Sequence, residues 1–184
     1  MNLARQHPDL YANILETRRG SFRGSVFLQE NGSLLRTREG VTGLEEAIRF
    51  LRHAQPLAPL VSSIGMSQAA GEHVADQAGG AFGHGGSDRS NPGARLNRHG
   101  AWSGTWGENI SYGKSSAREI VSALIIDDGQ RARKHRQNIF NPVFNVAGAA
   151  VGPHARYRTV CSIDFAGGYT ERGSLGATAL FARN

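Results

Sequence analysis

Apolar and polar positions alternate along the chain in two periods, one typical of helices and one typical of strands. The first 15 residues carry a helical pattern from residue 3 to residue 15, with a break expected near Pro8, because proline favours the first turn of a helix. Residues 21–35 predict a hairpin instead. Its apolar positions flank Asn31-Gly32, a strong two-residue turn signal.

Two further helical patterns follow. Thr42 and Glu45 have the spacing of a capping box, which predicts the start of a helix that ends before Pro56. Residues 60–78 predict a third helix, stopped by Gly79-Gly80. Its inward stripe should hold Met66, Ala70, His73 and Gln77. We interpret His73 as a hydrogen-bonded core histidine.

The fourth helical pattern is the clearest one. Ser116 and Glu119 form a capping box, an apolar stripe follows, and Gly129 should end the helix. Asp127 falls at the edge of the buried stripe near the helix C-terminus, where the helix dipole disfavours a negative charge. A carboxylate in that place indicates a cationic partner, either a metal or the basic residues that follow.

Residues 143–151 and 157–165 predict two strands, and the glycine-rich stretch 79–113 predicts mostly loop. Helices that enclose a small antiparallel sheet make an α+β sandwich. The length of 184 residues and the lack of a linker or repeat predict one domain over residues 1–184.

The net charge of +6 favours anionic partners. The basic residues cluster most densely at Arg131, Arg133, Lys134 and Arg136, which we interpret as a solvated loop after the fourth helix. No nucleic-acid-binding motif accompanies the charge, so we expect no specific nucleic-acid partner. No apolar run reaches the length of a membrane helix, and no signal peptide is visible. The single cysteine, Cys161, excludes an intramolecular disulfide and is interpreted as a small core residue.

Four polar side chains in the middle of the chain carry the candidate chemistry: His84, Glu108, Asp127 and His135. Two imidazoles and two carboxylates are what a divalent metal site or an acid/base site is made from. Their separation along the sequence does not by itself bring them together.

The segments that hold these four residues resemble the CAP domain of cysteine-rich secretory proteins, antigen-5 allergens and plant pathogenesis-related proteins, and its bacterial branch in particular. The motifs in order are His84-Gly-Gly-Ser-Asp88, Trp106-Gly-Glu-Asn-Ile110, Leu124-Ile-Ile-Asp-Asp-Gly129, His135-Arg-Gln-Asn-Ile-Phe140, Gly152-Pro-His154 and Asp164-Phe-Ala-Gly-Gly-Tyr169. The resemblance implies a three-layer α-β-α sandwich, with a small antiparallel sheet between helices and a central cleft.

The resemblance also implies that His84, Glu108, Asp127 and His135 lie in this cleft. The third member is usually glutamate, and here Asp127 stands at the matching point, with Asp128 as a competitor. A mixed nitrogen and oxygen ligand set favours zinc over calcium or magnesium. The alternative is a hydrogen-bonded network that orders the cleft without any metal.

Enzyme signatures are weak in this chain. The His-Glu-x-x-His run of common zinc proteases and the Gly-x-Ser-x-Gly elbow of α/β-hydrolases are both absent. The resemblance implies instead a secreted protein, extracellular or periplasmic, that binds a lipid, a sterol or a cell-envelope component. The alternative is a metal-dependent hydrolase that uses Glu108 as its general base.

Overall fold

The computed structural model of this protein describes residues 1–29 and 32–173. Its chain forms two compact units. Unit 1 comprises Met1–Pro59 and Ser116–Pro142, and unit 2 comprises Leu60–Ser115 and Val143–Asn184. The single domain over residues 1–184 stays a prediction.

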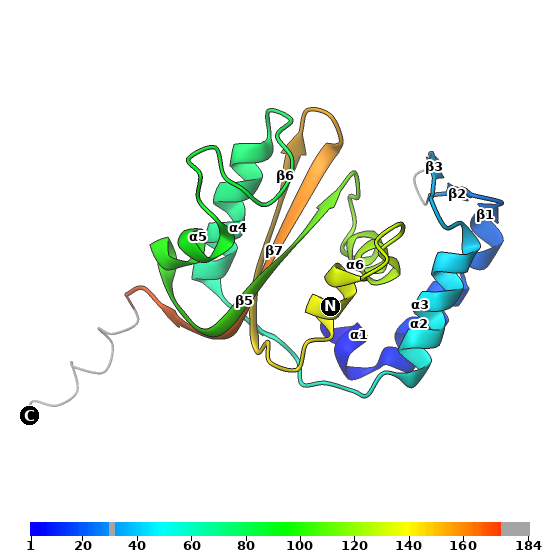
Figure 1. Ribbon diagram of the computed structural model, residues 1–184, viewed down its shortest axis with the longest axis horizontal. Coiled ribbons are helices and arrows are strands. Elements are labelled where there is room, and N and C mark those ends of the chain that lie inside the picture. Colours follow the sequence, from blue (N-terminus) through cyan, green and yellow to red (C-terminus); the bar gives the residue numbers. More distant parts are fainter. Residues whose placement is uncertain (30–31, 174–184) are drawn as a thin grey trace, which may run out of the picture. The chain divides into compact units, whose positions relative to one another are not determined.

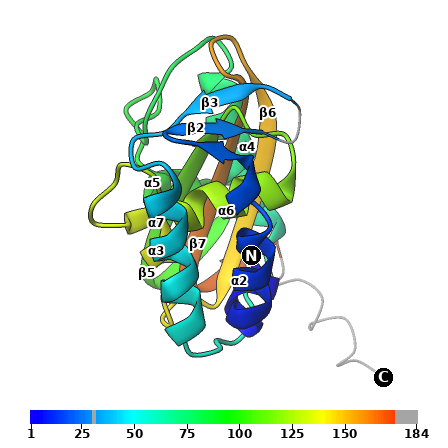
Figure 2. The ribbon, with the colours of Figure 1, turned by 90° about the vertical axis from the view of Figure 1, so that its right-hand side faces the viewer.

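Unit 1 is mainly helical. Its helices are α1 (Asn2–Gln6), α2 (Pro8–Glu16), η1 (Arg19–Ser21, a 3-10 helix), α3 (Val41–His53), α6 (Ala117–Ile126) and α7 (Lys134–Ile139). Figure 2 shows α2 and α3 side by side. Their apolar faces bury Leu15, Leu44 and Leu51 completely, and α6 contributes Ile125. The break between α1 and α2 falls at Pro8 as predicted, with proline in the first turn of α2.

Unit 1 also holds a small antiparallel sheet of β1 (Phe22–Arg23), β2 (Val26–Leu28) and β3 (Leu34–Arg36), in the order β1-β2-β3. The predicted hairpin corresponds to β2 and β3, whose register pairs Phe27 with Leu35. Asn31 of the predicted turn lies outside the described residues, and Gly32 has a φ of 80°.

Unit 2 is built on a four-stranded mixed sheet in the order β4-β6-β7-β5. The strands are β4 (Val61–Ser62), β5 (Gly100–Tyr112), β6 (Val146–His154) and β7 (Arg158–Glu171). The pair β6-β7 is antiparallel, as predicted. Strand β7 also pairs in antiparallel orientation with β5, a strand that was not predicted, and β4 joins β6 in parallel. Helices and strands in these two units confirm the α+β class.

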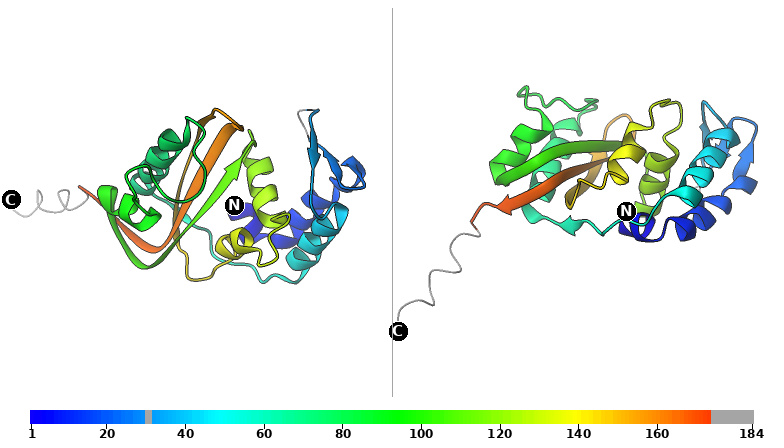
Figure 3. Two further views of the ribbon diagram at one scale, coloured as in Figure 1. Left: turned by 45° about the horizontal axis from the view of Figure 1, so that its top comes forward. Right: turned by 60° about the horizontal axis from the view of Figure 1, so that its bottom comes forward.

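Two helices of unit 2, α4 (Ile64–Gln77) and α5 (Pro92–His99), cover one face of this sheet (Figures 1 and 3). Gly148 of β6 allows α4 to lie close to the sheet, because a Cβ atom at this position would come within 2.3 Å of the Met66 backbone. The predicted inward stripe of α4 is confirmed, since Met66, Ala70, His73 and Gln77 are all buried.

The prediction that residues 79–113 are mostly loop is wrong. They contain α5 and the 13-residue strand β5. Asn91 caps α5 by accepting a hydrogen bond from the Ala94 backbone at 2.9 Å, and Pro92 occupies its first turn. The Asn91-Pro92 pair is the sequence feature from which the start of α5 could have been predicted. For β5, pairing with β7 overrides the poor strand propensity of glycine, and Gly104, with a φ of 76°, lies in the bulge between Ser103 and Trp106.

Three helix boundaries also differ from those predicted. The capping box at Thr42 is wrong: α3 begins at Val41 after Gly40, without a side-chain cap, and Glu45 instead accepts a hydrogen bond from Arg19 at 2.6 Å. Helix α4 begins at Ile64, because Val61–Ser62 pairs with β6 as strand β4. Helix α6 ends at Asp127, which itself adopts the left-handed conformation expected of Gly129.

The capping box of Ser116 and Glu119 at the start of α6 is confirmed. Cys161 is a buried free thiol, as predicted, and burial raises its pKa to about 11.

Trp102 and Trp106 pack against the cluster of Met66, Ala69, Leu96 and Ala166. Among the described residues, no helix has the length and apolar character needed to span a membrane.

Candidate functional site

Glu108 of β5 lies at the centre of a buried polar cluster in unit 2. It pairs in register with Asp164 of β7, which in turn pairs with Gly148 of β6. Directly opposite residues of antiparallel strands project to the same face of a sheet. Both acids therefore point to the face covered by α4 and α5, where the Glu108 side chain is 1% exposed.

Both carboxylate oxygens of Glu108 accept hydrogen bonds. Its Oε1 lies 2.7 Å from Nδ1 of His84. Its Oε2 accepts one bond from Nη2 of Arg95 at 2.8 Å and another from the hydroxyl of Ser162 at 2.9 Å. The carboxylate is thus held by three side chains from a loop, a helix and the neighbouring strand.

The charge state of Glu108 follows from these partners. Burial disfavours the charged form, but the hydrogen bond from His84 and the positive charge of Arg95 outweigh it and lower the pKa of Glu108. Glu108 is therefore ionised at neutral pH. Since a carboxylate can only accept hydrogen bonds, Nδ1 of His84 carries a proton and donates the hydrogen bond to Oε1 of Glu108.

Arg95 of α5 connects the carboxylate to the loop that bears His84. Its side chain is 2% exposed. Besides the bond to Glu108, its Nη1 donates to the carbonyl oxygens of His84 and Ser90, both at 3.2 Å. Arg95 therefore fixes both partners of the His84–Glu108 pair, whereas the His84 ring itself remains 54% exposed.

A second histidine, His73 of α4, lies near Glu108. Its Nε2 is 4.0 Å from Oε2 of Glu108 and 2.9 Å from the carbonyl oxygen of Gly83. Burial lowers the pKa of His73, so the ring is neutral at pH 7 and forms no ion pair with Glu108. The interpretation of His73 as a hydrogen-bonded core histidine is confirmed.

Asp164 is the least satisfied polar group of the cluster. It is fully buried, and neither carboxyl oxygen has a hydrogen-bond partner among the described residues. Burial raises the pKa of Asp164 well above its usual value, and the negative charge of Glu108 adds to this rise. The carboxyl group therefore favours its neutral form.

The other histidine–acid pair belongs to unit 1. Asp127 ends α6 in the left-handed conformation, and its Oδ1 accepts a hydrogen bond from Nδ1 of His135 at 2.7 Å. Its Oδ2 accepts from the backbone N–H of His135 at 3.0 Å, near the N-terminus of α7. A negative charge is favourable at a helix N-terminus, which offsets its unfavourable place at the end of α6.

Asp128 has a different role from Asp127. Its two carboxylate oxygens accept hydrogen bonds from the backbone N–H groups of Arg38, at 2.7 Å, and Glu39, at 2.8 Å. Asp128 thus fixes the segment that leads into α3. Of the two competing acids, Asp127 is the one that contacts His135.

The interpretation of the basic cluster as a solvated loop is wrong for two of its members. Arg133 donates to Glu39 at 2.6 Å, and Arg136, whose side chain is 3% exposed, donates to Glu46 at 2.7 Å. Arg136 also donates to the carbonyl oxygen of Ile125 at 2.6 Å. These charges are neutralised inside unit 1, because they secure the loop after α6 to α3.

Comparison with known proteins identifies the family. A family model described as CAP, the cysteine-rich secretory protein family, matches residues 46–165. The chain belongs to this family. A comparison with curated proteins gives no match.

Three solved structures are similar to this CAP chain. One is an extracellular protein with an SCP domain from Bacillus anthracis, with 21% identity over 65% of this chain and 37% of that chain and a TM-score of 0.49. Another is an outer surface protein from Borrelia burgdorferi, with 13% identity over 63% of this chain and 80% of that chain and a TM-score of 0.49. The third is a cysteine-rich secretory protein from Staphylococcus aureus, with 15% identity over 70% of this chain and 38% of that chain and a TM-score of 0.44. The match thus spans well under half of the Bacillus and Staphylococcus proteins, and the family assignment rests on the family model.

The CAP chain brings its four predicted site residues together as two pairs, His84 with Glu108 and Asp127 with His135. Within residues 1–29 and 32–173, no three histidine, cysteine, aspartate or glutamate side chains are grouped as metal ligands. That all four share one zinc site stays a prediction. Two residues of the Glu108 cluster were not predicted as site residues. Arg95 lies on α5, whose start at Asn91-Pro92 could have been predicted, and Asp164 entered only as part of a motif.

Proposed function

We propose that this CAP chain is an extracellular binding module for a lipid or a cell-envelope component, rather than a hydrolase. The state of Glu108 carries this proposal. A general base must accept a proton from water or substrate. Glu108 has a lowered pKa, a side chain that is 1% exposed and partners on both oxygens, which supports a structural role for the carboxylate.

An aromatic surface on unit 2 supports the choice of ligand. We define it as Phe82, Tyr112 and Tyr157. Phe82 is 71% exposed and stacks on Tyr112, with 4.6 Å between the ring centroids. The ring centroids of Tyr112 and Tyr157 are 5.3 Å apart. The guanidinium of Arg156 lies 5.4 Å from the ring of Tyr157. Tyr112 and Tyr157 are partly exposed. An exposed ring that extends over partly exposed rings beside a cation suits a lipid interface or the sugar rings of an envelope polymer.

The two histidine–acid pairs fit a role in metal binding. A histidine that binds a metal commonly gives its other ring N–H to a carboxylate, as Nδ1 does in both pairs. Within the proposal, His84 and His135 are the residues that would hold zinc, and Glu108 and Asp127 would orient their rings. A bound zinc ion would supply a Lewis acid.

Binding is tested by sedimentation of the pure protein with lipid vesicles and, separately, with purified bacterial cell envelopes. Phe82→Ala should weaken binding roughly tenfold, because an aromatic contact of this kind contributes about 1 kcal/mol beyond its buried area. Leu34→Ala is the matched control, since Leu34 is also 71% exposed but belongs to β3 of unit 1. Equal binding of the two variants would contradict the proposed surface.

The hydrolase alternative predicts a different result. The pure protein would then turn over a peptide, ester or envelope substrate in the presence of metal, and both a chelator and Glu108→Gln would abolish this turnover. We expect no turnover to be lost in Glu108→Gln, because we expect none in the wild type. Metal-dependent turnover that disappears in this variant would favour the hydrolase.

A further inference from the structure

In unit 2 the loop after α4 lies beside the turn that joins β6 to β7 (Figure 1). The backbone N–H of Ala155 in this turn donates a hydrogen bond to the carbonyl oxygen of Ala78 at 2.9 Å. Nδ1 of His154 accepts from the backbone N–H of Tyr157 at 3.1 Å, so Nε2 carries the proton and donates to the carbonyl oxygen of Ala81 at 2.9 Å. The loop and the turn are thus held together at one end of the sheet.

Two arginines of this turn extend the aromatic surface. The guanidinium of Arg156 lies 5.4 Å from the centre of the Tyr157 ring. Arg158 stands opposite His154 in the antiparallel register. The ring of His154 lies 5.3 Å from that of Tyr112 and 5.1 Å from that of Tyr157, measured between centroids. Both arginines therefore lie next to the aromatic surface.

Unit 2 does not neutralise these two positive charges. Arg156 and Arg158 are exposed, and neither forms an ion pair with an acid in the part of the chain that the structure describes. The sequence after residue 173 contains no aspartate or glutamate. The other acids of unit 2 are engaged elsewhere or buried: Glu72 and Asp88 contact Arg98, Asp76 accepts from the Ser87 backbone, Glu171 accepts from the Gly65 backbone, and Glu108 and Asp164 are buried.

The conformation of Arg158 supports a role for its side chain. Its φ of 72° falls in the left-handed region, which glycine adopts readily and other residues adopt rarely. Local backbone preference therefore does not favour arginine at this position. Residues held in such conformations cluster at sites that contact ligands, which agrees with binding by the guanidinium group.

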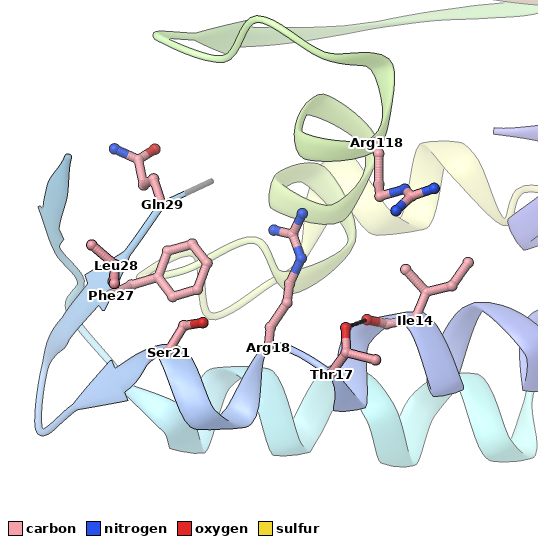
Figure 4. A pocket seen from close by; sticks show the side chains of 8 residues that line it. All are labelled: Ile14, Thr17, Arg18, Ser21, Phe27, Leu28, Gln29 and Arg118. Carbon is pink, nitrogen blue, oxygen red and sulfur yellow. Dashed lines mark hydrogen bonds between the residues drawn. The ribbon is translucent and has the colours of Figure 1, made fainter. Parts of the chain in front are cut away.

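Among the described residues, two other arginines lie over aromatic rings, both in unit 1. Arg136 lies 4.8 Å from the centre of the Phe50 ring, but its side chain is 3% exposed and pairs with a carboxylate of α3. Arg18 lies 5.8 Å from the centre of the Phe27 ring, at a cavity of about 210 Å³ where both residues are half-buried (Figure 4). Arg156, by contrast, is exposed and can reach a partner outside the molecule.

The polar atoms among the rings favour a bilayer over a sugar polymer. The Tyr112 hydroxyl donates to Gln77 at 2.8 Å and accepts from the Gly83 backbone N–H at 3.0 Å. Both ring nitrogens of His154 are bonded to backbone groups. Recognition of sugar hydroxyls needs placed donors and acceptors. A bilayer needs only an apolar side chain that enters it and cations for its headgroups, which Phe82 and the two arginines supply.

We propose that the aromatic surface, together with Arg156 and Arg158, docks on the surface of an anionic lipid bilayer. Phe82 enters the boundary between headgroups and acyl chains, and the two guanidinium groups bind lipid phosphates. Basic residues strengthen binding to an anionic membrane within about a Debye length of it. This inference rests on the proposed function, within which it selects a lipid partner.

The test is co-sedimentation of the full chain with vesicles of phosphatidylglycerol and, separately, of phosphatidylcholine, at low and at high salt. We expect tighter binding to phosphatidylglycerol, weakened by salt. Arg156→Gln and Arg158→Gln should each lower the affinity roughly fivefold, and the double variant about 25-fold, because each basic residue near an anionic membrane contributes about that much. Arg49→Gln is the matched control: it removes one charge from an exposed arginine of α3 in unit 1 and should leave the affinity unchanged.

A second measurement tests the insertion of Phe82. In phosphatidylglycerol vesicles that carry bromine on the upper part of the acyl chains, Phe82→Trp should show more fluorescence quenching than the wild type. Leu34→Trp is the matched control, since Leu34 is equally exposed but belongs to unit 1, and its added tryptophan should not be quenched. Thermal denaturation checks that each variant is folded.

The possible outcomes separate this inference from the proposed function. Equal affinities for the two kinds of vesicle, equal affinities of the double variant and Arg49→Gln, or equal quenching in Phe82→Trp and Leu34→Trp would overturn the inference. Binding to lipid-free envelope polymer without binding to vesicles would also overturn it, while the proposed function would stand. Binding to neither would overturn both.

Discussion

Replacing Arg95 by glutamine should destabilise the protein strongly, because Arg95 neutralises a buried carboxylate. The two side chains are 2% and 1% exposed, and Nη2 of Arg95 lies 2.8 Å from Oε2 of Glu108. Glutamine keeps a polar head but removes the positive charge. Glu108 would then be a buried anion without a cationic partner at Oε2, where the Ser162 hydroxyl still donates, while His84 still donates to Oε1.

The size of the effect follows from the burial of the pair. Removing one partner of a buried ion pair costs about 3–5 kcal/mol, most of which is the penalty of the charge left behind. Arg98, three residues later on the same helix, provides the matched control. It contacts Glu72 and Asp88, but its side chain is 41% exposed, so Arg98→Gln should destabilise the protein far less than Arg95→Gln.

The cost of Arg95→Gln should also depend on pH. In the wild type the pKa of Glu108 is lowered below 4.5, so its ionised form contributes stability above pH 4.5 that is lost as the pH falls through the folded-state value. In Arg95→Gln this contribution is lost, and protonation relieves the unpaired charge. The difference in unfolding free energy between the two proteins should therefore be largest at neutral pH and shrink below pH 4.5.

Urea denaturation at several pH values, followed by circular dichroism, measures these differences. If Arg95→Gln does not fold, Arg95→Lys keeps the charge without the fork and should give a smaller loss in the same assay. A cost of Arg95→Gln no larger than that of Arg98→Gln, or a cost that does not change with pH, would refute the reasoning.

Three further predictions concern other groups. Asp164→Asn should stabilise the protein at pH 7 but not below pH 3.8. Because the pKa of Asp164 is raised by folding, the contribution of this carboxyl group to the free energy of unfolding falls as the pH rises, by about 1.4 kcal/mol for each unit by which the pKa is raised. Urea denaturation at both pH values measures this difference. Cys161→Ala should cost about 1 kcal/mol of packing and stay monodisperse without reductant in light scattering, whereas a protein whose assembly depends on oxidation would show an intermolecular bridge. Calorimetric titration should show that zinc binds the wild type and binds His84→Ala and His135→Ala more weakly. The affinity should fall at acid pH, because histidine must be neutral to bind a metal. Equal zinc affinities of the wild type and the two variants would reject these histidines as zinc ligands.

Local signals in the sequence determined much of the helical structure. The capping box of Ser116 and Glu119 starts α6, and Pro8 separates α1 from α2. The inward stripe of α4 placed His73 in the core. These features depend on neighbours three or four positions apart, so the sequence contains both partners of each interaction.

Only the tertiary structure decided the state of the site residues. Glu108 owes its lowered pKa to Arg95 and His84, which are 13 and 24 positions away on other elements. The long strand β5 runs through a glycine-containing segment because it pairs with β7, from Gly100 opposite Glu171 to Tyr112 opposite Val160. Asp127 and Asp128 are adjacent and chemically alike, yet one contacts His135 and the other the backbone before α3. Burial, pairing and charge compensation at these positions arise from residues distant in the chain, which is why composition and periodicity predicted the helices but not the environment of the carboxylates.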